Sequence, residues 1–237
     1  MTLTDDIRTK LAGVTTATLT TVLLKKGLRN CWIRGGLPLT AAAQGRRVVG
    51  EAFTLRFIPM REDLATPASW ENPISTRAAI EAMPEGVIAV ADAMGVADAG
   101  IFGDILCQRM AVRKVAALVT DGVLRDLAGV EQTGLPVWAA GTAAPASIAG
   151  LTFVGWNEPV ACGGVAVFAG DIIVADTDGA VVIPGDVLDA VVDAAVEQER
   201  MEGWIMNEAR NGAALPGLYP MNADTKARYD AWVAGQA

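Results

Sequence analysis

Residues 103–126, with the sequence GDILCQRMAVRKVAALVTDGVLRD, contain the pattern that decides the fold prediction. Segment 103–114 has helical spacing and opens with Gly-Asp, whereas 115–120 is a short apolar run typical of a buried strand. Another apolar run, GVIAVAD at 86–92, precedes them. Strands separated by single helices imply parallel pairing with right-handed crossovers, so we expect an α/β fold.

The same patterns assign the remaining segments. Helices are expected in the first 30 residues, at 74–83, 125–133 and 185–210, and near the end of the tail. Strands are expected at 47–58, as one long strand or a pair, and at 135–141, 151–155, 164–170, 171–177 and 179–184, with a loop at 59–73. The strands after Gly150 are short and divided by glycines and acids, which predicts antiparallel or barrel-like pairing there.

Composition limits the class of protein. The 237 residues are 52% hydrophobic and 19% charged, which predicts a buried core. A net charge of −8 gives no general reason to bind nucleic acid or anionic lipid. The chain has no apolar run of the roughly 18 to 20 residues that span a bilayer, and its start lacks a signal-peptide core. Three widely spaced cysteines form no disulfide or zinc pattern, so we expect a cytoplasmic protein without nucleic-acid or membrane partners.

The chain contains no histidine. This excludes Ser-His-Asp and Cys-His catalysis, histidine metal ligation and the commonest base near neutral pH. Any catalysis must therefore use carboxylates, Arg, Lys, Tyr, hydroxyls, thiols or a hard metal ion.

Two loops of the predicted sheet could form a site. Gly103 follows one expected strand and Arg125–Asp126 follows the next, so both lie at the same sheet edge. The amides of Asp104, Ile105 and Leu106 at a helix start could donate to a carboxylate. Arg125 could bind the head of a small acid and Asp126 a cation such as Mg²⁺. Because adjacent side chains point in different directions, we expect these two charges to serve a substrate and a metal, not each other.

An ordinary structural interpretation competes with this one. An Arg-Asp pair after a strand is commonly a helix cap with a surface arginine, and Gly-Asp is an ordinary helix start. Cys107, on the helix after the glycine loop, is expected to be a small core residue and not a nucleophile.

The spacing of Asp104, twenty residues, Arg125 and Asp126 resembles the hallmark of a known family. That family contains the class II pyruvate aldolases for 4-hydroxy-4-methyl-2-oxoglutarate and 4-carboxy-4-hydroxy-2-oxoadipate, and the RraA-like proteins named as regulators of ribonuclease E. The stretches GRRVVGEAFTL at 45–55 and PVACGGVAVFAGDIIVADTDGAVVIP at 159–184 add to the resemblance, which covers about residues 12–205.

The resemblance implies a swivelling α/β/β domain with a mixed parallel and antiparallel sheet core and a long C-terminal helix. Residues 1–205 would form this domain, and 206–237 an extension packing on the domain or on a neighbouring subunit. The family assembles as a homotrimer, sometimes doubled to a hexamer, with sites between subunits.

The resemblance also implies roles for site residues. Gly103 to Leu106 would supply amides to the pyruvyl group of a 2-oxo acid, and Arg125 would bind it as well. Asp126 would ligate Mg²⁺ or Mn²⁺, and Asp104 would hold a metal-bound water. A neighbour's acidic helix would add a catalytic carboxylate, here Glu199, with Glu197 and Glu202 as the other candidates.

The implied activity is metal-dependent cleavage of a 4-hydroxy-2-oxo acid of the 4-hydroxy-4-methyl-2-oxoglutarate type to pyruvate and a second oxo acid, with oxaloacetate decarboxylation through the same enolate. The alternative is a non-catalytic regulator that binds a ribonuclease or another protein. Many relatives place an acid four residues after the arginine, where this chain has Gly129. The tail after Gly203 also exceeds the family's shorter members, which leaves the substrate open, a sugar-derived acid included.

Overall fold

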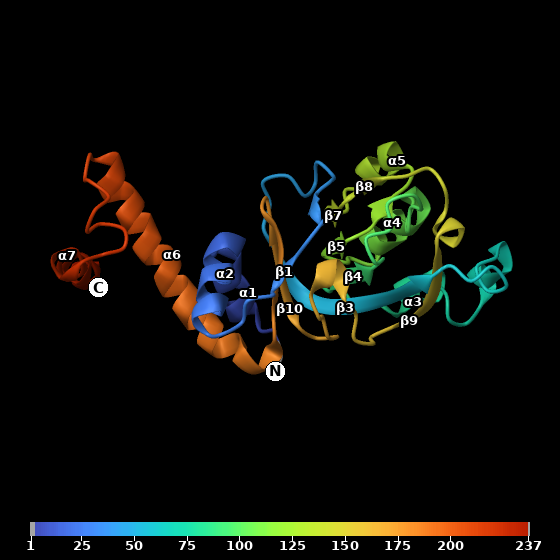
Figure 1. Ribbon diagram of the computed structural model, residues 1–237, viewed down its shortest axis with the longest axis horizontal. Helices are drawn as coiled ribbons and strands as arrows, with labels where there is room; N and C mark the ends of the chain where they lie inside the picture. Colours follow the sequence, from blue (N-terminus) through green and yellow to red (C-terminus); the bar gives the residue numbers. More distant parts are fainter. Residues whose placement is uncertain (1–2, 237) are drawn as a thin grey trace.

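The computed structural model describes residues 3–236 and has a mixed α/β architecture (Figure 1). The first two residues of the expected domain and the last residue of its extension lie outside this range. The helices are α1 (Asp5–Ala12), α2 (Thr16–Lys25), α3 (Thr76–Ala82), α4 (Asp104–Val112), α5 (Leu127–Gln132), α6 (Leu188–Arg210) and α7 (Ala223–Ala234). Short 3₁₀ helices are η1 (Pro67–Glu71), η2 (Ser147–Ala149), η3 (Cys162–Gly164) and η4 (Gly185–Val187).

The strands form one curled sheet in the order β1-β11-β10-β3-β4-β5-β7-β2, with β9 also paired to β3 and a separate small β6-β8 pair. Their bounds are β1 (Trp32–Ile33), β2 (Leu37–Pro38), β3 (Val48–Pro59), β4 (Ile88–Asp92), β5 (Ala117–Thr120), β6 (Val123–Leu124), β7 (Val137–Ala139), β8 (Gly141–Thr142), β9 (Leu151–Trp156), β10 (Ile172–Asp176) and β11 (Gly179–Ile183).

The single long strand β3 joins two differently paired halves of the sheet. Its middle pairs in parallel with β4, which continues in parallel to β5 and β7. Its start pairs antiparallel with β10 and its end antiparallel with β9. The predicted parallel strand-helix rhythm and the antiparallel pairing after residue 150 are therefore both confirmed.

The core divides into layers on the two sides of the curled sheet. One apolar cluster fills the space beneath α3, α4 and α5, and another lies beneath α1, α2 and α6. A third fills the inside of the curl, where Trp138 is fully buried and its indole N–H donates to the backbone oxygen of Asp176 at 2.6 Å. None of the described helices combines the length and apolar character needed to cross a bilayer.

One predicted strand, 164–170, is wrong. Only Val167 of this segment pairs, through an isolated bridge to Val160. Gly163 and Gly164 both have positive φ, 57° and 75°, which turns the chain into η3 and away from the extended path of a strand. Apolar alternation alone did not reveal this turn.

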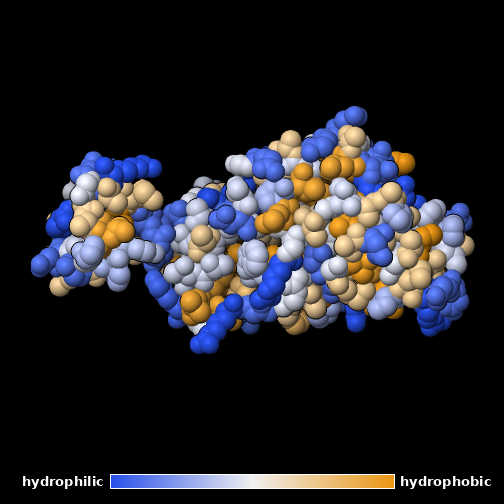
Figure 2. Space-filling model, turned by 45° about the horizontal axis from the view of Figure 1, so that its top comes forward, coloured by the Kyte–Doolittle hydropathy of each residue, from blue (hydrophilic) through white to orange (hydrophobic). Residues whose placement is uncertain are grey.

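The C-terminal residues form a separate unit at the end of α6 (Figure 1). Trp204 and Ile205 of α6 pack with Leu218 and with Tyr229 of α7 in a small cluster of their own. The unit stands apart from the α/β body in the space-filling view (Figure 2), and its Leu215 is exposed. The extension thus packs on the end of α6, and its contact with a neighbouring subunit stays a prediction.

Asp121, directly after β5, links the end of β4 to η3 next to the loop that carries Arg125. Its carboxylate accepts the backbone N–H of Ala93 at 2.8 Å and that of Gly163 at 3.0 Å. Burial raises the pKa of Asp121, although these two hydrogen bonds oppose the shift.

This raised pKa predicts a pH-dependent effect of Asp121→Asn on stability. A carboxyl whose folded-state pKa is raised contributes stability that is complete below its unfolded pKa of about 3.9 and is lost as pH rises through the folded pKa. We expect the free energy of unfolding of the wild type, minus that of the variant, to be larger at pH 4 than at pH 7 in urea titrations. A difference that is constant or grows with pH would contradict this.

Candidate functional site

A pocket of about 270 Å³ lies where the expected loops meet. The loop after β4 leads into α4, and the one after β5 continues through β6 to Arg125, so the parallel strands bring both to one sheet edge. The lining residues are Trp70, Thr76, Arg77, Gly100, Ile101, Gly103, Asp104, Ile105, Leu106, Arg125, Asp126, Ala146 and Ser147. All predicted site residues of these two loops therefore line one cavity.

Arg125 and Asp126 form an ion pair, contrary to the expectation that their charges would not meet. The Arg125 Nε lies 2.9 Å from Asp126 Oδ2. Side chains of adjacent residues usually point in different directions. Asp126, however, has left-handed backbone angles, φ 54° and ψ 40°, and its side chain lies beside that of Arg125. Within residues 3–236 the terminal nitrogens of Arg125 and Oδ1 of Asp126 make no hydrogen bond, so both groups keep capacity for a ligand.

Two glycines allow the first loop to lie directly against this pair. A Cβ on Gly100 would be 2.8 Å from the backbone nitrogen and the Cβ of Arg125. A Cβ on Gly103 would be 2.7 Å from Asp126 Oδ2. The Arg125 N–H also donates to the Phe102 oxygen at 3.0 Å. The loops are thus in backbone contact, and larger side chains at either glycine would separate them.

Asp104 begins α4 and lines the same pocket. Its Oδ1 accepts the Ile105 N–H at 2.7 Å, so this amide, expected to bind substrate, already has a partner. The backbone N–H groups of Asp104 and Leu106 have none within the described chain. They remain available donors at the positive end of the helix dipole.

The structure shows which side chain occupies the space next to Gly129. A Cβ there would lie 2.6 Å from both the Cβ and Oδ2 of Asp104. The Asp104 side chain therefore occupies the space that a side chain at position 129 would need. In this backbone Gly129 therefore leaves room for the Asp104 side chain.

Trp70 and Arg77 complete the pocket and were missed from the sequence. The Arg77 guanidinium carbon lies 4.9 Å from the centre of the Trp70 ring. No acidic side chain within residues 3–236 forms a salt bridge with Arg77. Trp70 comes from η1, inside the segment expected to be loop, and nothing in the local pattern indicated that it faces the site.

The candidate glutamates of α6 do not line the pocket of their own chain. Glu199 accepts the N–H and hydroxyl of Thr15 at 3.1 and 3.2 Å. Glu202 accepts the Thr18 hydroxyl at 3.1 Å, and Glu197 the Tyr229 hydroxyl at 2.9 Å. A carboxylate from a neighbouring subunit therefore stays a prediction.

The donor groups of the pocket fit Mg²⁺ or Mn²⁺. Among residues 3–236 no group of three or more Cys, Asp or Glu side chains is placed to hold a metal ion. Mg²⁺, however, is commonly bound by one or two carboxylates, with waters and substrate oxygens completing the shell. Asp126, with a free oxygen, and Asp104 supply hard oxygen donors of this kind, and Gly103 leaves the space beside Asp126 open.

Cys107 is a core residue, as expected. It lies on the buried face of α4 and is fully buried. Burial, together with the charge of Asp104, raises the pKa of its thiol to about 12. The group is therefore a neutral thiol at physiological pH and is unsuited to act as a nucleophile.

Comparison with known proteins gives a consistent family assignment. The model of the RraA-like family, described as Aldolase/RraA, matches residues 16–182. The protein DlpA of Legionella pneumophila is 28% identical over 193 residues, 81% of this chain and 30% of that protein. A Halalkalibacterium halodurans protein named "Putative 4-hydroxy-4-methyl-2-oxoglutarate aldolase" is 35% identical over 139 residues, 58% of this chain and 60% of that protein. The chain thus spans less than two thirds of either relative.

Solved structures share the fold. Streptomyces coelicolor RraAS2, described as an unusual member of the RNase ES inhibitor RraA protein family, matches with a TM-score of 0.76 and 34% identity, over 86% of this chain and 97% of that chain. An uncharacterized Pseudomonas syringae protein matches with a TM-score of 0.77 over 92% of this chain and 99% of that chain, and at 23% identity it supports the fold alone.

The contact between Gly129 and Asp104 predicts a specific double-mutant result. Gly129→Ala should lower the free energy of unfolding by about 1–3 kcal/mol because the new methyl overlaps Asp104. In an Asp104→Gly background, which removes the overlapping Cβ, the same substitution should cost much less in urea titrations. Additive effects of the two substitutions would show that the side chains do not compete for this space.

The raised pKa of Cys107 predicts an unreactive thiol. At pH 8 about one thiol in ten thousand would be ionised at a pKa near 12, so native protein should resist a disulfide-exchange reagent at this position. Mass spectrometry after brief labelling, with urea-unfolded protein as control, measures this. Rapid labelling of Cys107 in the native protein would contradict the prediction.

Proposed function

We propose that this chain, which belongs to the RraA-like family, is a divalent-metal-dependent lyase. It cleaves the bond between C3 and C4 of a 4-hydroxy-2-oxo acid to give pyruvate and a second oxo compound, and it decarboxylates oxaloacetate. The observation that carries the proposal is the convergence of Arg125, Asp126 and Asp104 on one pocket at the start of α4.

The pyruvyl end of the substrate would lie between α4 and Arg125. The terminal nitrogens of Arg125 can donate two parallel hydrogen bonds to a carboxylate. The free N–H groups of Asp104 and Leu106 add donors at a helix N-terminus, where negative charge is favoured. The ion pair with Asp126 engages the guanidinium at its Nε and leaves the terminal nitrogens without a partner in the described chain, free to bind a carboxylate.

The reaction moves an electron pair toward the 2-oxo group. When C3 and C4 separate, the pair of the broken bond stays on C3 as a pyruvate enolate, while the 4-hydroxyl loses its proton and becomes a carbonyl. A divalent cation held by Asp126, with Asp104 beside it, would supply positive charge near the developing enolate oxygen. Since no histidine is present, a carboxylate that lines the pocket, Asp104, would take the hydroxyl proton.

The proposal includes an assembly and a location. On the family resemblance, the chain forms a homotrimer or hexamer in the cytoplasm with sites between subunits, and Glu199 of α6 approaches the pocket of an adjacent copy. The intrachain bonds of Glu199 to Thr15 would then orient the helix face that meets the neighbour.

A second candidate function is a non-catalytic regulator that binds a ribonuclease or another protein. The likeness to RraAS2, a member of an RNase ES inhibitor family, supports it. Asp104 favours the enzyme, because a protein that only binds a partner has little need for a second carboxylate in a pocket with a free arginine edge.

Pyruvate release tests the enzyme. Purified protein with Mg²⁺ or Mn²⁺ should form pyruvate from oxaloacetate or from 4-hydroxy-4-methyl-2-oxoglutarate, measured with a coupled dehydrogenase. Asp126→Asn should lower kcat on the order of 10²–10³-fold, as loss of an electrostatic stabiliser does. Asp230→Asn on α7, outside the pocket, is the matched control and should retain wild-type rates. Folded protein without metal-stimulated turnover on any 2-oxo acid would favour the regulator.

A further inference from the structure

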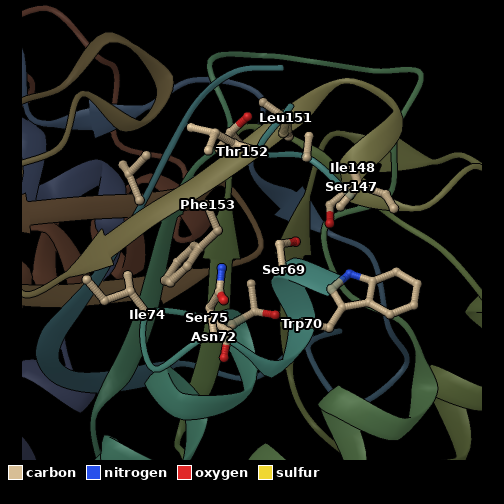
Figure 3. A pocket seen from close by; sticks show the side chains of 14 residues that line it. Ser69, Trp70, Asn72, Ile74, Ser75, Ser147, Ile148, Leu151, Thr152 and Phe153 are labelled. Carbon is tan, nitrogen blue, oxygen red and sulfur yellow. The ribbon is translucent and has the colours of Figure 1, made fainter. Parts of the chain in front are cut away.

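A second pocket adjoins the candidate site. It has a volume of about 230 Å³ and lies between the η1 segment, η2 and β9. Figure 3 shows the rings of Phe153 and Trp70 at opposite sides of it, with Ser69 and Ser147 between them. Its full lining is Leu64, Ala65, Ser69, Trp70, Asn72, Ile74, Ser75, Thr76, Ser147, Ile148, Leu151, Thr152, Phe153 and Val154.

The two pockets share three wall residues, Trp70, Thr76 and Ser147. The two spaces are therefore neighbours that meet at these residues, and the tail of a molecule bound at Arg125 and Asp126 would enter the second space beside Trp70. The volume exceeds the roughly 150 Å³ of a protein cavity that holds benzene. It is large enough for a chain of several heavy atoms beyond the reacting carbons.

The second pocket contains no charged side chain. Both arginines of this region, Arg77 and Arg125, and both aspartates, Asp104 and Asp126, line the first pocket. A carboxylate moved into the second pocket would lose water without gaining a cation, which is strongly unfavourable. The lining therefore favours an uncharged group over a carboxylate.

The pocket does offer hydrogen bonds. The Ser69, Ser75 and Thr152 hydroxyls hold the surrounding loops, bonding the Thr66 oxygen and the N–H groups of Ala78 and Arg61. The side chains of Asn72 and Ser147 make no hydrogen bond within the described chain and keep their full donor and acceptor capacity. An amide and a hydroxyl of this kind suit a hydroxylated ligand better than a plain alkyl chain.

We propose that this second pocket is a subsite for an uncharged, hydroxylated tail on C4 of the substrate. The inference rests on the proposed lyase function and narrows it to 4-hydroxy-2-oxo acids derived from sugars. For a 2-oxo-3-deoxyhexonate, breaking the C3–C4 bond leaves the electron pair on C3 and moves the 4-hydroxyl proton to a base. Protonation of C3 then gives pyruvate, and carbons 4 to 6 leave as glyceraldehyde.

A matched pair of substrates tests the charge requirement. The 2-oxo-3-deoxyhexonate is compared with its counterpart whose terminal CH₂OH is oxidised to a carboxylate, each with Mn²⁺ and pyruvate detection. We expect kcat/KM to be at least tenfold higher for the hexonate. Equal or faster cleavage of the oxidised compound would overturn the proposal that the tail is uncharged. If 4-hydroxy-2-oxohexanoate, which has a plain ethyl tail, is cleaved faster than the hexonate, the proposal that the tail is hydroxylated is wrong.

Variants test the pocket itself. Ala65→Phe should fill it, since Ala65 lines this pocket and not the first. The rate ratio of hexonate cleavage to decarboxylation of oxaloacetate, which has no tail, should fall at least tenfold. Asn72→Ala should lower the same ratio several-fold. Ala68→Phe, on an exposed position of η1 outside both pockets, is the control and should leave the ratio unchanged.

Oxaloacetate distinguishes a failure of the subsite proposal from a failure of the proposed lyase function. If it is decarboxylated and the hexonate is not cleaved, or if Ala65→Phe leaves the ratio unchanged, the subsite is wrong and the lyase stands. If neither of these compounds nor 4-hydroxy-4-methyl-2-oxoglutarate reacts in folded, metal-supplemented protein, the proposed lyase function itself is wrong and the subsite proposal is wrong as well.

Discussion

The candidate site depends on a backbone contact between two loops that are about twenty residues apart along the chain. Gly100 and Gly103 lie so close to Arg125 and Asp126 that a Cβ on either would overlap them. The parallel pairing of β4 and β5 brings the loops to one edge, and the missing side chains let them touch. The guanidinium, the carboxylate and the start of α4 therefore share one small cavity because both conditions hold together.

Asp104 depends on a glycine in a neighbouring helix for its position in the pocket. Its carboxylate occupies space that exists because position 129 has no side chain. The Asp104 carboxylate therefore lies at the first turn of α4, against the backbone of α5 at Gly129.

Much of the parallel half of the fold could be predicted because β4 and β5 are buried along their whole length and therefore form uninterrupted apolar runs. The strand expected at 164–170 failed because the positive φ angles of Gly163 and Gly164 redirect a segment whose composition still resembles a strand. The Arg125–Asp126 ion pair was missed for a related reason, since a left-handed aspartate leaves no periodic signal. Trp70 and Arg77 come from a separate segment, and only the folded chain brings them to the pocket.

The small core shared by the end of α6 and α7 divides the molecule into parts of unequal stability. Its principal buried side chains are Trp204, Ile205, Leu218 and Tyr229, too few to balance the conformational entropy of the segment on their own. Such a unit opens locally at a lower free energy than the sheet, and its amide hydrogens exchange with solvent sooner. The chain end can therefore melt and re-form while the strands that carry the pocket stay folded.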